Sequence, residues 1–125
     1  MEDGHTITLE ARPNPVEFDA GKTAVIVVDM QNDFGAKGGM FDRAGIDISG
    51  IQKVVAPTAR VLSAARHAGV KIIYLKMGYH PDLSDLGAPD SVNRVRHLRM
   101  GVGETMRAPD GRESRILIRP VHSSP

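Results

Sequence analysis

The stretch Thr23-Ala-Val-Ile-Val-Val-Asp-Met-Gln-Asn-Asp-Phe34 decides the fold of this chain. Its first part, residues 24–28, is an unbroken aliphatic run dominated by valine. A short run of this kind, bounded by polar residues, is typical of a parallel-sheet strand that is buried on both faces. The run ends at Asp29, and ligands of open parallel sheets bind outside the carboxyl ends of the strands. Asp29 is therefore the first candidate for chemistry.

The residues after this strand predict a helix and then a second strand. Between residues 51 and 68 the apolar positions recur with a helical period, and Gly69 is a suitable helix end. Pro57 must lie in a first turn or kink a helix that begins earlier, and Ser49 is a possible N-cap. The run Val70–Met77 predicts a strand, so the three elements form one βαβ crossover of an α/β fold. The predicted buried stripe of the helix consists of Val54, Thr58, Val61, Leu62 and Ala65.

The two ends of the chain lack such patterns. Pro13 and Pro15 argue against a central strand or a helix in residues 1–22, which we expect to lie across the domain as an arm pinned by Phe18. Residues 78–125 contain five glycines and five prolines, so we expect a long irregular stretch in which only residues 115–119 form a short regular element. Residues 120–125 are expected to be a coil tail.

Composition excludes several classes of partner. The 125 residues carry a formal net charge of +1, which gives no electrostatic reason to expect nucleic acid or an anionic membrane as a partner. No apolar run approaches the roughly 18 residues of a membrane span, and the acidic N-terminus does not resemble a signal peptide. There is no cysteine, which excludes a disulfide or a thiolate metal site within these residues. We expect a single, cytoplasmic globular domain.

The signature residues support a family resemblance. Residues 24–34, followed by Gly38-Gly39, a helix, Gly69 and a strand, resemble the isochorismatase-like hydrolases. Residues 11–13, 18–19 and 44–49 are similar to the ureidoacrylate amidohydrolases of pyrimidine degradation, and residues 79–86 are similar to biuret hydrolases. The resemblance extends from about residue 11 to residue 119.

The resemblance implies a flavodoxin-like parallel-sheet fold and a catalytic triad of Asp, Lys and Cys, in which Asp29 takes the position of the Asp. In the implied mechanism the Cys thiolate attacks an amide carbonyl, the Asp relays the thiol proton and the Lys supplies positive charge, without a cofactor. This sequence contains no Cys, and none of its lysines lies at the motif position. We therefore expect residues 23–119 to be a partial, incomplete isochorismatase-like domain. We expect this domain to be the N-terminal half of a hydrolase of small linear amides, whether truncated, frameshifted or split, and to be inactive by itself.

Three more residues are candidates for the substrate pocket. Gln31 could contribute polar contacts and Phe34 apolar cover, although both could equally serve packing. His80 is expected to be a loop histidine near the pocket. Together with Asp82 and Asp85 it suggests the metal site of related nicotinamidases, but the Asp-x-His motif and the second His of that site are missing. We therefore expect no metal.

Basic residues gather between Arg94 and Arg107, and nearby acidic residues compensate most of their charge. A solvated loop or a subunit contact is favoured over a nucleic-acid surface, and one arginine could bind a substrate carboxylate. Exposed sheet edges predict a homo-oligomer or association with a partner that completes the sheet. The alternative function is thus a non-catalytic remnant or interaction subunit. A phosphoryl-accepting aspartate domain is disfavoured because Met30 and Gln31 replace the acidic neighbours that such domains require.

Overall fold

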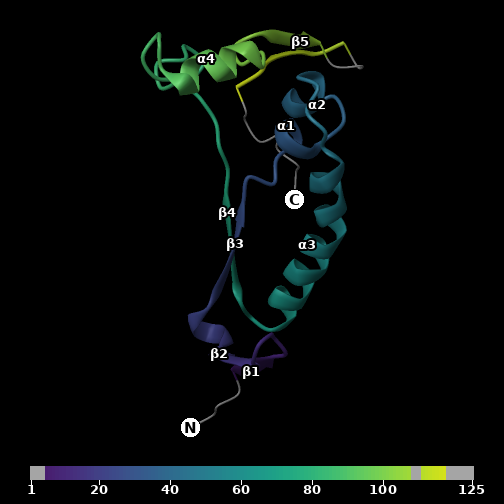
Figure 1. Ribbon diagram of the computed structural model, residues 1–125. Coiled ribbons are helices and arrows are strands. Elements are labelled where there is room, and N and C mark those ends of the chain that lie inside the picture. The colour runs from purple at the N-terminus through teal and green to yellow at the C-terminus, as the bar shows by residue number, and fades with distance from the viewer. Residues whose placement is uncertain (1–4, 108–110, 118–125) are drawn as a thin grey trace. The chain divides into compact units, whose positions relative to one another are not determined.

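The computed structural model describes residues 5–107 and 111–117, which divide into two compact units (Figure 1). Unit 1 contains the described residues up to Val28 together with Lys53–Leu75. Unit 2 contains Asp29–Gln52 and the described residues from Lys76 onward. Among the described residues, no helix combines the length and the apolar character needed to cross a membrane.

Unit 1 begins with a β-hairpin. Strand β1 (Thr6–Leu9) pairs antiparallel with β2 (Val16–Asp19), and the short 3₁₀ helix η1 (Ala20–Lys22) follows. The N-terminal arm therefore contains two regular strands, which were not expected because of Pro13 and Pro15. Both prolines lie in the connection between the strands, where a missing backbone N–H interrupts no ladder.

The predicted βαβ crossover is confirmed. Strand β3 (Ala24–Val28) pairs in parallel with β4 (Lys71–Leu75), and the helix α3 (Ser49–His67) lies between them in the sequence. A small core gathers where the end of α3, the start of the sheet and the hairpin meet. It consists of Ala20, Ala65 and Val70, with Ile7, Phe18, Val25, Ala68 and Ile72 packed against it.

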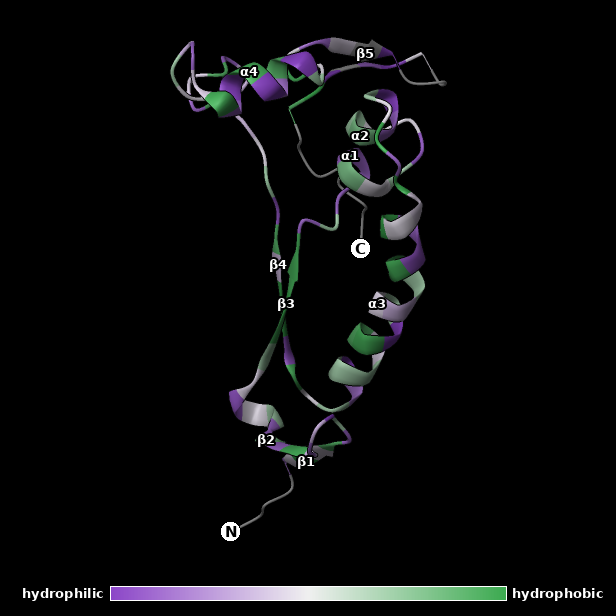
Figure 2. Ribbon diagram, in the orientation of Figure 1, coloured by the Kyte–Doolittle hydropathy of each residue, from purple (hydrophilic) through white to green (hydrophobic). Residues whose placement is uncertain are grey.

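The expectation that β3 is buried on both faces is wrong for the described structure. Val27 is 7% exposed, whereas Ile26 and Val28 are 54% and 56% exposed. The described part of the chain pairs β3 with β4 alone, and the parallel register places alternate residues of both strands on one face. Figure 2 shows the hydrophobic character of this two-stranded sheet. Its exposed apolar face consists of Ile26, Val28, Ile73 and Leu75.

Helix α3 starts earlier than the predicted range, which accommodates Pro57 within the helix. Ser49 is not the N-cap: it is the first helical residue, and its N–H donates to the Asp47 carboxylate at 2.9 Å. Of the predicted stripe, Leu62 and Ala65 are buried, whereas Val54 and Val61 are 45% and 55% exposed.

Unit 2 contains more regular structure than the sequence predicted. The elements are α1 (Asn32–Gly35), α2 (Met40–Arg43), α4 (Val92–Arg99), β5 (Thr105–Arg107) and β6 (Glu113–Arg115), with β5 and β6 paired antiparallel. The expectation that only residues 115–119 form a regular element after residue 78 is therefore wrong, whereas residues 78–91 contain no helix or strand, as expected. Helix α4 is too polar to show a clear apolar period, and its first turn is stabilised by the Ser91 hydroxyl, which accepts from the Arg94 N–H.

The short element predicted at residues 115–119 is only partly found. Arg115 ends β6, Ile116 and Leu117 are buried outside any strand, and residues 118–119 lie outside the described residues, as does the predicted tail at 120–125. The core of unit 2 consists of Met40, Tyr79, Leu86, Val102 and Ile116.

Candidate active site

Asp29 directly follows the carboxyl end of β3, where the parallel-strand rule predicts a ligand. Its backbone adopts a φ of +58°, a left-handed conformation that is uncommon for a residue other than glycine. Its carbonyl oxygen accepts a hydrogen bond from the Gln31 N–H at 2.9 Å. The chain thus turns sharply after the strand and leaves the Asp29 carboxylate exposed to solvent.

Gln31 joins the segment after β3 to the segment after β4. Its side-chain Nε2 donates to the Met77 carbonyl at 2.8 Å, and its Oε1 accepts from the Met77 N–H at 2.8 Å. Gln31 is a buried polar residue, and only 8% of its surface is exposed. The amide therefore imitates a backbone bridge between two segments that are 46 residues apart in the sequence.

Phe34 lies in α1 and packs on Phe41 of α2, with ring centroids 4.8 Å apart. Both rings pack against the core of unit 2. Of the two roles open to Phe34, the structure documents packing. Its contact with a substrate stays a prediction.

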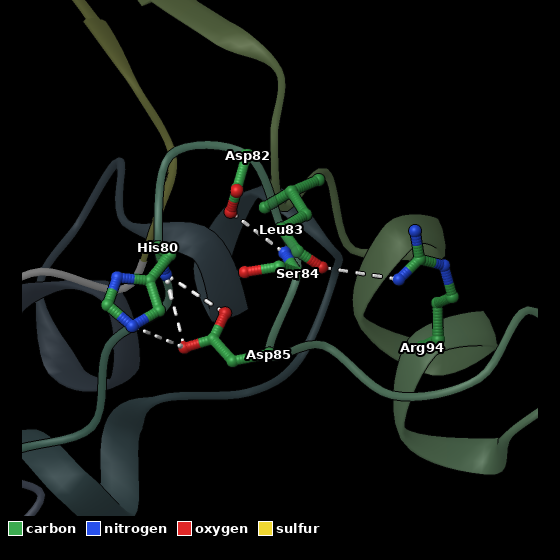
Figure 3. Close-up of polar contacts among 6 residues, drawn as sticks. All are labelled: His80, Asp82, Leu83, Ser84, Asp85 and Arg94. Atoms are coloured by element: carbon green, nitrogen blue, oxygen red, sulfur yellow. Dashed lines mark hydrogen bonds and ion pairs between the residues drawn. The ribbon is translucent and has the colours of Figure 1, made fainter.

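His80 lies three residues beyond Met77, in a loop whose polar contacts are drawn in Figure 3. Its side chain is 71% exposed, and its Nε2 is 3.9 Å from an Asp85 carboxylate oxygen. Together with Pro81, Asp82 and Ser84 it lines an open hollow of about 470 Å³. The residues described in the structure include no group of three or more acidic or imidazole side chains placed to hold a metal ion.

Asp33 is a carboxylate of this region that the sequence analysis did not single out. Burial raises its pKa, while the Met40 N–H, which donates to its Oδ1 at 3.2 Å, and the charge of Arg43 act in the opposite direction. Its position as the second acid of the signature, four residues after Asp29, was the available signal. A partly buried carboxylate with a shifted pKa is a feature found often at functional sites.

Asp33 also gives a pH-dependent prediction. Its pKa is raised above the usual 3.8 in the folded chain, so between the unfolded and the folded pKa the folded state binds more protons than the unfolded state. Stability therefore falls as the pH rises from the usual pKa through the raised one. The variant Asp33→Asn keeps the acceptor for Met40 and removes the desolvated charge. We expect it to be more stable than the wild type at pH 7 and equally stable below the usual pKa of the group.

Urea unfolding of both proteins at several pH values measures this difference. Asp82→Asn is a control whose pH dependence should have the opposite sign. The Ser84 backbone N–H donates to the Asp82 carboxylate and lowers its pKa, so Asp82 contributes stability that is lost as the pH falls. A stability difference between Asp33→Asn and wild type that grows toward low pH would contradict the assignment.

Comparison with known proteins identifies the class. A family model described as the isochorismatase domain matches residues 23–110, a range that includes β3, Asp29, α3, β4 and the His80 region. The chain belongs to the isochorismatase family, as the resemblance of its signature predicted.

Among curated relatives, the chain is similar to ureidoacrylate amidohydrolases. The protein named ureidoacrylate amidohydrolase RutB from Methylorubrum extorquens is 47% identical over 87 residues, which are 70% of this chain and 35% of the relative. RutB of Rhizobium rhizogenes is 44% identical over 93 residues, 74% of this chain and 38% of the relative. RutB of Caulobacter segnis is 41% identical over 113 residues, 90% of this chain and 46% of the relative. The chain thus spans between about a third and a half of the length of these relatives.

Proposed function

We propose that this chain provides the aspartate-bearing part of a hydrolase site for small linear amides of the ureidoacrylate type, acting in pyrimidine degradation. The observation that carries the proposal is the position of Asp29, at the carboxyl end of a parallel strand and inside the region shared with the isochorismatase family. The names of the relatives suggest the substrate class.

The residues of the site suggest a separate role for each side chain. Asp29, with its exposed carboxylate, is placed to exchange a proton with a nucleophile, which is the role of a general base in acyl transfer. Gln31 holds the segment of Asp29 against the segment that leads to His80. Phe34 anchors the same segment in the core, and His80 faces the hollow in which a polar substrate group could bind.

The nucleophile is the part that these residues do not supply. The 125 residues include no cysteine, so a thioester intermediate requires a thiolate from another polypeptide segment. We therefore propose that the 125-residue chain binds a ureidoacrylate-like amide and does not turn it over alone. Losing the nucleophile of a catalytic triad removes most of its rate enhancement.

The test uses the purified 125-residue chain and ureidoacrylate. We expect substrate loss, followed by chromatography, to equal that in buffer, and we expect ureidoacrylate to shift the amide resonances of residues 29–34 in NMR spectra. Asp29→Asn should weaken this binding, whereas Asp90→Asn, which changes an exposed carboxylate outside the site, should not. Turnover that disappears in Asp29→Asn contradicts the inactivity of the chain, and an absence of both turnover and binding contradicts the substrate class.

A second candidate function is favoured by the exposed apolar sheet face. Its four aliphatic residues lie on one side of β3 and β4, and parallel sheets are normally covered on both faces. A non-catalytic subunit that associates with itself or with a partner completing the sheet would bury them. In the same experiment, a defined oligomer in sedimentation without any ureidoacrylate binding favours this second function.

A further inference from the structure

The loop of residues 80–87, which we call the His80 loop, is held in a compact form by hydrogen bonds from its backbone N–H groups to its own carboxylates. The His80 N–H donates to the Asp85 carboxylate at 3.0 and 3.2 Å, and the Ser84 N–H donates to Asp82 Oδ1 at 3.0 Å (Figure 3). Leu83 adopts a φ of +58° and Leu86 is fully buried. A left-handed leucine persists only where its surroundings hold it.

Arg94 holds the loop from the side of α4. Its Nη1 donates to the Leu83 carbonyl at 3.3 Å (Figure 3). The same nitrogen donates to the Gly87 carbonyl at 3.0 Å. Asn93, which precedes Arg94 in α4, donates from its Nδ2 to the Leu86 carbonyl at 2.9 Å. The carbonyls of Leu83, Leu86 and Gly87 are thus satisfied by the first turn of one helix.

Arg115 holds the loop from the side of β6. Its Nε donates to the Gly103 carbonyl at 3.0 Å, and its Nη1 donates to the Pro81 carbonyl. Gly103 has a φ of +94°, and a Cβ there would lie 2.8 Å from Leu83 Cδ1, so the absence of a side chain lets Leu83 pack close to this strand connection. The two arginines therefore contact the loop near both of its ends.

We propose that Arg94 and Arg115 are positioning residues that fix the His80 loop, so that His80 and Asp82 line their hollow in a preformed arrangement. The functional meaning of this arrangement rests on the role proposed above for His80.

The two arginines use their donors differently, and this difference supplies a test. Arg115 uses two nitrogen atoms for two carbonyls, a fork that a lysine ammonium does not reproduce. Arg94 uses one nitrogen for both of its carbonyls, which a lysine could imitate. Arg115→Lys should therefore loosen the loop, and Arg94→Lys should do so much less. Arg94→Gln, which removes the cation, should loosen it as well. Arg96→Lys, on the exposed side of α4, is the matched control.

Amide hydrogen exchange, measured by NMR on the full chain, reports the result. We expect the exchange of the Leu83, Ser84 and Leu86 amides to rise about tenfold or more in Arg115→Lys and Arg94→Gln. The amides of β3 and β4 and the Arg96→Lys control should stay within about twofold of the wild type. Unchanged exchange in the loop, or an equal rise throughout unit 2, would overturn the proposal.

Ureidoacrylate titration of the same proteins separates this inference from the proposed function. If both hold, Arg115→Lys weakens binding about tenfold, whereas Arg60→Lys, which changes an exposed arginine of α3 outside the site, leaves it unchanged. A wild-type chain that does not bind ureidoacrylate contradicts the proposed function, whereas the exchange data still decide whether the two arginines position the loop. Loosened exchange with unchanged ureidoacrylate binding contradicts the functional part of the inference.

Discussion

Replacing Gly39 with alanine is expected to lower the free energy of unfolding by on the order of 3 kcal/mol. A Cβ built on Gly39 would lie 2.2 Å from the Asn32 carbonyl oxygen and 3.0 Å from the Ala36 carbonyl oxygen. Both atoms belong to the backbone, so no side-chain rotation can relieve the overlap. The Gly39 N–H also donates to Ala36 at 3.0 Å, which fixes the close approach of the α1–α2 connection. Urea unfolding followed by circular dichroism measures the loss.

Gly50→Ala is the matched control for this prediction. Nothing lies within 4 Å of a Cβ at Gly50, which is the second residue of α3. Alanine there should raise stability by about 0.5 to 1 kcal/mol, since it restricts the unfolded chain and favours the helix. The two glycine-to-alanine changes should thus affect stability in opposite directions. A Gly39→Ala protein as stable as wild type would show that α1 and α2 are not held as closely as described.

Replacing Gln31 with leucine should cost about 2 to 4 kcal/mol, because it removes the partners of the Met77 N–H and carbonyl. Leucine is close to glutamine in size, so the change acts on hydrogen bonds rather than on volume. The segment after β3 should then separate from the segment after β4, and the Met77 amide should lose its protection from hydrogen exchange. Urea unfolding gives the stability change, and NMR locates it.

Gln31→Glu tests whether the donated hydrogen bond matters. An ionised glutamate accepts from the Met77 N–H but has no proton to donate to the Met77 carbonyl. Only the protonated carboxyl restores both bonds, so the pKa of the introduced group should be raised in the folded chain. Stability relative to wild type should then be best at low pH and should fall as the pH rises through that raised pKa. Equal deficits of Gln31→Glu at pH 4 and pH 7 would exclude this account of the bridge.

Local patterns were sufficient for the central elements. The aliphatic run of residues 24–28 predicted β3 with its observed bounds, because a short apolar run closed by polar residues has few other stable conformations. The helical period, Gly69 and the following aliphatic run likewise predicted α3 and β4, although the helix begins two residues before the predicted range and β4 is shorter than the predicted 70–77. The signature around Asp29 was sufficient for the family, which the match over residues 23–110 confirms.

Features that depend on distant parts of the chain were not predicted. Helix α4 carries only a weak apolar pattern, and it is held by the Ser91 cap and by the contacts of Asn93 and Arg94 with the His80 loop. The hairpin at the N-terminus was missed because the position of its prolines, between the strands and not within them, is a property of the pairing. The catalytic role of Asp29 and the substrate contacts of Gln31, Phe34 and His80 stay predictions.

Local sequence patterns were sufficient for the α/β class, the βαβ crossover, the family and the position of Asp29 at a strand end. These are properties of neighbouring residues, which local hydrophobic periodicity and a contiguous motif record directly. Three features became apparent only from the folded chain: the exposed face of β3 and β4, the bridge from Gln31 to Met77 and the contacts of two arginines with the His80 loop. Such contacts join residues far apart in the chain, and their energies depend on burial and geometry that no local pattern contains.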